Sequence, residues 1–128
     1  MKRTKTNLSE EKLKKWIEQM YHKYKTVLFI EKYHLKIEAD KEKNGYLASQ
    51  FNYPYLDIKI LYSVKFFEDW KKDKAEAERR LIHEFCHTIT DQFYSVVVNF
   101  PTKVQIEEAR ERLTDHIAQI VNKHFKLL

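Results

Sequence analysis

The sequence predicts an α+β fold, a single domain over residues 1–128. Apolar residues recur at helical spacing near the beginning of the chain and through its second half, and they alternate with polar residues in between. Gly45, the only glycine, follows Asn44 in a charged turn between two alternating segments. We therefore expect an N-terminal helix, a three-stranded antiparallel sheet and two long C-terminal helices.

The first helix is expected over residues 8–24, after a basic segment, residues 1–7, that we expect to be disordered. The apolar positions of this helix form one stripe with spacings of three and one. They are Leu13, Trp16, Ile17, Met20, Tyr21 and Tyr24.

Three strands are expected next, joined as an antiparallel meander. The first, residues 33–38, alternates apolar and polar side chains, which is typical of a half-buried strand. The second and third strands are expected over residues 46–53 and 56–64, with Pro54 interrupting the pairing between them. In the third strand, Ile58, Ile60 and Tyr62 share one face.

The second half of the chain is expected to be helical. Residues 66–74 lead into a long helix over residues 73–94, whose apolar residues recur at intervals of four. These residues are Ala77, Leu81, Phe85, Ile89 and Phe93. Residues 95–102 are expected to turn the chain, and Thr102 to cap a final helix over residues 103–125.

Composition narrows the cellular setting and the partners. The chain has no apolar run near the ~20 residues that span a bilayer and no visible secretory signal, so we expect a cytoplasmic protein. The single cysteine, Cys86, agrees with a reducing compartment. The net charge of +5 favours a lysine-rich solvated surface, and nucleic-acid binding remains an alternative.

The motif His83-Glu84-Phe85-Cys86-His87 lies at the centre of the long predicted helix. Residues four apart lie about 40° apart around a helix and one turn apart along it, so both imidazoles can reach one metal ion. Imidazole nitrogen is a good zinc ligand. Glu84 lies about 100° from His83 and is placed to take a proton from a metal-activated water. The alternative is that two histidines are simply exposed on an amphipathic helix. The residues that flank them are apolar, however, and indicate that the helix is buried.

A third metal ligand is expected on the last helix, because catalytic zinc usually takes three protein ligands. On a helical projection, Glu111 lies near the edge of the apolar arc, and Asp115 follows one turn later, where it could hold a histidine ring. Glu107 lies inside the arc and is the alternative ligand, whereas Glu108 points further out.

These motifs resemble the gluzincin metallopeptidases, of which thermolysin is the reference member. The run His83–Asp91, with its closing Thr90-Asp91, is similar to the thermolysin active helix. Glu111, followed by Thr114 and Asp115, is similar to the ligand helix. The order of elements is similar to that of minimal gluzincins and small phage-type metallopeptidases.

The resemblance implies a zincin-like fold with one Zn²⁺. Glu111 would be the third ligand, and Asp115 would hydrogen-bond a ligating histidine. Phe85 and Cys86 depart from the small residues that this family often has between the histidines. The residue that stabilises the oxyanion has no clear match, and Tyr94 and His116 are candidates for it.

We therefore expect a small zinc-dependent peptidase with Glu84 as general base. A peptide or protein substrate would add as a strand to an exposed sheet edge formed by residues 46–53. One alternative is a metal-stabilised, non-catalytic module that binds a protein partner. Another is a DNA-associated protease similar to the SprT type, which salt-sensitive DNA binding would favour.

Overall fold

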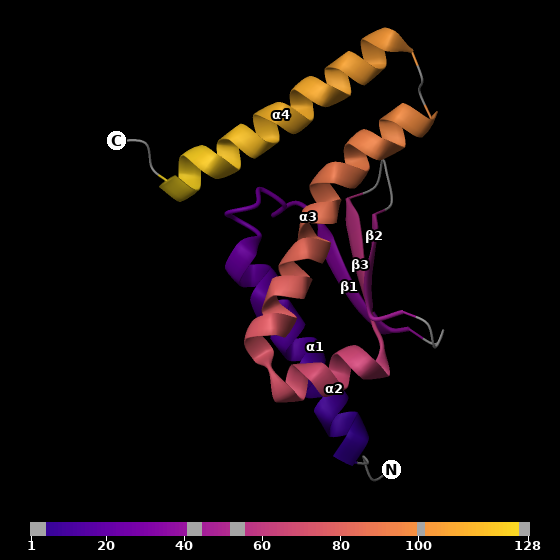
Figure 1. Ribbon diagram of the computed structural model, residues 1–128, viewed down its shortest axis with the longest axis vertical. Helices are drawn as coiled ribbons and strands as arrows, with labels where there is room; N and C mark the ends of the chain where they lie inside the picture. Colours follow the sequence, from indigo (N-terminus) through magenta and orange to yellow (C-terminus); the bar gives the residue numbers. More distant parts are fainter. Residues whose placement is uncertain (1–4, 41–44, 52–55, 100–101, 126–128) are drawn as a thin grey trace.

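The computed structural model of the chain describes residues 5–40, 45–51, 56–99 and 102–125. Its elements are helix α1 (Lys5–Tyr24), strands β1 (His34–Ala39), β2 (Leu47–Phe51) and β3 (Asp57–Tyr62), and helices α2 (Val64–Lys72), α3 (Lys74–Asn99) and α4 (Lys103–Phe125) (Figure 1). The predicted α+β class is confirmed. Within these ranges, no helix combines the length and the apolar character that a membrane span requires.

Strand β3 occupies the centre of the sheet, in the strand order β1-β3-β2. β1 pairs with β3 in parallel, with Leu35 opposite Ile58. β2 pairs with β3 in antiparallel, with Ser49 opposite Ile60, and is therefore an edge strand. Ile58, Ile60 and Tyr62 are buried on one face of β3, which confirms the face predicted from their alternation.

The prediction of an entirely antiparallel sheet is wrong, because β1 and β3 run in the same direction. Alternation specifies which face of a strand is buried, but it does not specify the neighbouring strand or its direction. The N–H of Asp40 donates to the carbonyl of Tyr62, and the N–H of Ser63 donates to the carbonyl of Tyr46. β1 and β2 therefore lie on opposite sides of β3 and do not form a hairpin with each other.

Gly45 does not form a left-handed turn, because its φ is not positive. A Cβ atom at this position would lie 2.5 Å from a carboxylate oxygen of Asp40, which is the end of a flexible side chain and can move aside. Asn44 and Pro54, and residues 52–53 of the predicted second strand, lie outside the described residues.

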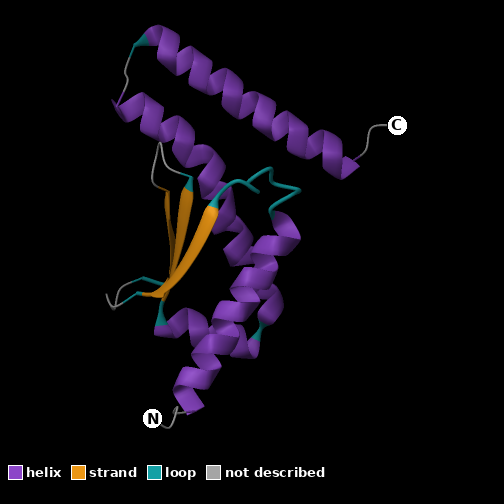
Figure 2. Ribbon diagram, turned by 180° about the vertical axis from the view of Figure 1, so that it is seen from behind, coloured by secondary structure: helices purple, strands orange, loops and turns teal. Residues whose placement is uncertain are grey.

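Helices α1 and α3 lie on one side of the sheet, whereas α4 lies beyond the end of the sheet, as Figures 1 and 2 both show. Helix α3 is the central one, since it contacts α1, α2, α4 and strand β2. Its residues at intervals of four, Ala77, Leu81, Phe85 and Ile89, are all buried, as their spacing predicts. The rest of the core comes from α1, the segment after it, β3 and α2: Leu13, Ile17, Tyr21, Leu28, Ile30, Ile58, Ile60, Tyr62, Phe66, Phe67 and Trp70.

Three helix boundaries differ from those expected. α1 begins at Lys5, so the predicted disorder is wrong for residues 5–7, and residues 1–4 lie outside the described residues. Residues 66–74, expected as a lead-in, belong mostly to α2. α3 continues beyond residue 94 to Asn99, so the turn expected over residues 95–102 is wrong for residues 95–99.

Helix α4 has the predicted bounds, and its predicted cap is also confirmed. The side-chain oxygen of Thr102 accepts a hydrogen bond from the N–H of Gln105 at 3.3 Å. Ser63 caps α2 and Asp73 caps α3 in the same way. At the far end of α4, the Lys123 ammonium donates to the carbonyl of Thr26, which ties the helix to the segment after α1.

Replacing Phe85 with alanine tests whether α3 is held by core packing. Phe85 has 0% exposure and packs edge-on against the Tyr21 ring, at 5.7 Å between centroids. We expect the substitution to lower the free energy of unfolding by about 3–5 kcal/mol, measured by urea denaturation. Val104→Ala, at a position with 64% exposure on α4, is the control and should change it by less than about 0.5 kcal/mol. Equal effects of the two substitutions would contradict this packing.

Candidate metal centre

The two histidines and the glutamate of the motif lie on different parts of the α3 surface. Glu84 is one residue from His83 and one from Phe85, so it lies about 100° around the helix from each. Phe85 belongs to the buried face and His83 is exposed. Glu84 therefore lies between the core and the open face, and only 8% of it is exposed.

The rings of His83 and His87 converge at their Nε2 atoms, which are 3.2 Å apart. Two ligands that each lie 2.0–2.1 Å from one zinc ion at the tetrahedral angle are separated by about 3.3 Å. The observed separation therefore suits two ligands of one ion. It also suits an N–H···N hydrogen bond between the rings.

Asp91 orients the ring of His87. Its Oδ1 atom is 3.3 Å from Nδ1 of His87, one turn further along α3. If the proton of the neutral imidazole is on Nδ1, it is donated to this carboxylate, and Nε2 is left free to bind a metal. This role of Asp91 is not among those predicted from the sequence, although its position four residues after His87 places both residues on one helix face.

Glu84 brings a carboxylate to the two imidazoles. The ligand atoms of His83, Glu84 and His87 all lie within 4.8 Å of one another, so this group could hold a metal ion. Two neutral imidazoles and a carboxylate are donors that suit zinc.

The surroundings of Glu84 affect its carboxylate through a hydrogen bond from β2 and through burial. The hydroxyl of Ser49 points at its carboxylate from β2, at 3.5 Å, because Ser49 shares the helix-facing side of the sheet with Ile60. Burial raises the pKa of Glu84 above its ordinary value, although the nearby histidines pull the pKa down. A raised pKa brings a carboxylate closer to the range useful for a general base near neutral pH.

The metal-binding group lies in a groove between α3 and the edge strand β2, which consists of two adjoining hollows. Both are lined by Leu47 and Glu84. One extends along α3 through His87 and Asp91 to Tyr94. The other extends in the opposite direction and is lined by Tyr46, Leu47, Glu76, Arg79, Arg80, His83 and Glu84.

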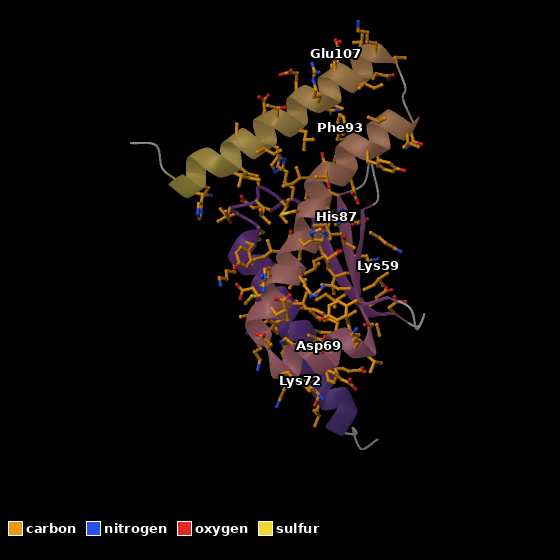
Figure 3. All side chains as sticks on the ribbon, viewed as in Figure 1. Lys59, Asp69, Lys72, His87, Phe93 and Glu107 are labelled. Carbon is orange, nitrogen blue, oxygen red and sulfur yellow. The ribbon has the colours of Figure 1, made fainter. Side chains whose placement is uncertain are left out.

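The predicted third ligand, Glu111, is not brought to this group, and neither is the alternative, Glu107. Each of them lies two residues, about 200°, from Ala109, which is buried, so both side chains are exposed and point away from α3. Figure 3 shows Glu107 near the beginning of α4, far from His87 at the middle of α3.

The packing of α4 explains this difference. Helix α4 contacts α3 around Ile89 and Phe93, which line a cavity between the two helices together with Leu113. Ile89 lies about 200° around α3 from His87. The helix that was expected to supply the third ligand therefore covers the opposite face of α3. The sequence gives the apolar arc of α4, but not the face of α3 against which that arc packs.

The other predicted site residues fall in different places. Tyr94 lines the groove, 67% exposed, on the same face of α3 as His87. His116 lies in the cavity between α3 and α4, where its Nε2 atom is 2.6 Å from the carbonyl of Leu28. Asp115 is exposed on α4, and the carboxylate that pairs with His87 is that of Asp91. Burial raises the pKa of the Cys86 thiol, which disfavours the thiolate that metal binding requires.

Comparison of the chain with models of known protein families, with characterised proteins and with solved structures found no match in any of the three.

Metal binding should depend on the histidines and not on the glutamates of α4. We expect His83→Ala and His87→Ala each to abolish stoichiometric zinc binding, because each removes one of two converging ligands. Glu111→Ala and Glu107→Ala should bind zinc as the parent chain does, since both side chains point away from the site. Zinc content after dialysis, measured by elemental analysis, checks all four variants. Loss of zinc in Glu111→Ala would instead support the ligand set predicted from the sequence.

Asp91→Asn tests the hydrogen bond to the ring of His87. We expect zinc affinity to fall by about 10- to 100-fold, because the ring loses the acceptor that orients it. Asp115→Asn is the matched control, since it makes the same chemical change at the aspartate that the sequence predicts as the partner of a histidine ring. Competition titration with a zinc chelator measures both affinities. A larger loss in Asp115→Asn than in Asp91→Asn would contradict the structure.

Proposed function

We propose that the chain is a small zinc-dependent metallopeptidase of the H-E-x-x-H type. The observation that carries the proposal is the separation of 3.2 Å between the Nε2 atoms of His83 and His87, beside a buried Glu84. A purely structural metal site has no need of a buried carboxylate next to its ligands. Here that carboxylate also lies at the point where the two hollows of a groove meet.

In this proposal, His83 and His87 hold the ion, and Asp91 keeps the ring of His87 in the required tautomer. When bound, zinc supplies Lewis acidity, which polarises a carbonyl group and makes water a stronger acid. Glu84 accepts a proton from a water molecule while the oxygen of that water attacks the carbonyl carbon of the peptide bond. When the C–N bond breaks, Glu84 returns the proton to the leaving amine nitrogen.

The position of β2 at the edge of the sheet favours a peptide as the substrate of this site. An extended peptide can pair with the backbone of an edge strand, so the polypeptide chain itself provides part of the affinity. β2 lies at the edge of the sheet and forms one wall of the groove that contains Glu84. The hydroxyl of Tyr94, on the same groove, is our candidate for stabilising the oxyanion.

The resemblance to gluzincins supports this proposal through α3 alone. The residues that carry it are the motif itself and Asp91, which closes the similar run. It does not extend to the third ligand, because the glutamates of α4 lie on the outer side of that helix. We therefore propose the reaction of the family without its complete set of metal ligands.

Glu84→Gln separates proton transfer from metal binding. The substitution keeps the size of the side chain but removes its ability to accept a proton, so we expect full zinc content and a loss of hydrolysis of at least about 100-fold. Cleavage is measured by mass spectrometry on a library of peptides from a digested protein mixture. Glu108→Gln, at an exposed position on α4, is the control and should cleave as the parent does.

Two outcomes would count against the proposal. If Glu84→Gln cleaves as fast as the parent chain, Glu84 is not the general base. If the parent chain binds zinc but cleaves no peptide in the library, the site supports the non-catalytic, metal-stabilised module instead.

A further inference from the structure

One face of α3 forms the floor of the groove along most of the helix. Glu76, Arg80, His83, His87 and Tyr94 all lie within about 60° of one another around the helix axis. From Glu76 to Tyr94 the helix rises about 27 Å, a length that matches about eight residues of extended peptide. The groove is therefore long enough to contact a substrate on both sides of the metal-binding group.

Apart from Glu84, which lines both hollows, the end of the groove before His83 carries two guanidinium groups and one carboxylate. Glu76 forms ion pairs with both Arg79 and Arg80. These three side chains together carry one unbalanced positive charge. Arg80 is also held over the ring of Tyr46, at 4.7 Å from its centroid. The hydroxyl of Tyr46 donates to Asp69 at 2.9 Å, which fixes the ring.

The other end of the groove has the opposite character. Among the described residues that line it, the charged ones are Glu84, Asp91 and, when protonated, His87. Tyr94 and Leu47 provide the apolar surface there. The groove thus presents guanidinium groups on one side of the metal-binding group, and a carboxylate and an aromatic ring on the other.

The order of the lining residues gives the direction of the edge strand. Tyr46 lines the arginine end, and Ala48 and Ser49 line the end near Tyr94, so β2 runs from the arginine end towards Tyr94. A peptide that pairs with β2 in antiparallel, the more stable pairing, runs in the opposite direction. Its C-terminal part then lies at the arginine end.

We propose that this groove selects peptides with an acidic side chain on the C-terminal side of the cleaved bond, and that Arg80 binds this carboxylate. The inference rests on the proposed peptidase function and specifies its substrate. Arg80 is the principal residue because Glu76 and the ring of Tyr46 orient its guanidinium group, which lowers the entropy lost on binding. Arg79 adds charge from a more exposed position.

Cleavage profiling of the zinc-loaded parent chain on the same peptide library tests this proposal. We expect Asp and Glu to be enriched within three residues on the C-terminal side of the cleaved bonds. In Arg80→Gln, this enrichment should fall by about five- to tenfold, as expected for the loss of a charged hydrogen bond at a partly exposed site. Arg110→Gln, which makes the same charge change on the outer side of α4, should keep the parent profile.

A binding measurement gives a second readout without turnover. On zinc-loaded Glu84→Gln protein, fluorescence anisotropy compares labelled hexaglutamate with labelled hexaglutamine. We expect hexaglutamate to bind about five- to tenfold more tightly. Adding Arg80→Gln should remove the preference.

The outcomes separate this inference from the proposed function. If the parent chain cleaves peptides without acidic enrichment, or with enrichment on the N-terminal side of the bond, the peptidase stands and the inference fails. An unchanged preference in Arg80→Gln, with normal zinc content and melting temperature, would also overturn it. If no peptide is cleaved, the proposed function fails. A preference for hexaglutamate that depends on Arg80 would then show only a site that binds acidic peptides.

Discussion

The packing of α3 between the core and the edge strand is the constraint on which the site depends. Phe85 and its neighbours at intervals of four hold one face of α3 in the core. This fixes the rotation of the helix, because a buried face cannot turn outward without exposing large apolar side chains. The histidines then open to the groove, and Glu84 is held between the two faces, against Ser49 of β2. The position of the proposed base and the burial that raises its pKa therefore follow from core packing.

The second consequence of this rotation is a line of polar residues along one helix face. Asp91 orients His87 from one turn beyond, and Glu76 holds two arginines from the turns before His83. Each of these contacts is a spacing of three or four residues within one helix. The metal-binding group and the proposed selectivity for acidic peptides thus share one scaffold. In our proposals, the sheet contributes an edge for the backbone of the substrate, and α3 contributes the chemistry.

Local features of the fold could be predicted from the sequence, and features that depend on how elements pack could not. The spacing of apolar residues predicted the bounds of α4 and the buried face of α3. The motif identified the His83, Glu84 and His87 group, because its geometry lies within a single helix. The direction of β1 relative to β3 was missed, since alternation is the same in parallel and antiparallel pairs. The assignment of Glu111 depended on the face of α3 that α4 covers, which is a tertiary property. Asp91 could have been assigned from its spacing to His87, but Asp115 was predicted instead, from its place one turn after Glu111 and from the resemblance to gluzincins.

The most direct test of the proposed metal site is to count the imidazole rings that bind one zinc ion. X-ray absorption spectroscopy of the zinc-loaded chain measures the type of ligand atom, its distance and the count of imidazole rings. We expect two imidazole nitrogens at about 2.0–2.1 Å and no sulfur ligand. A chain that takes up no zinc, or a spectrum with a sulfur ligand at about 2.3 Å and no imidazole, would contradict the metal site proposed on α3.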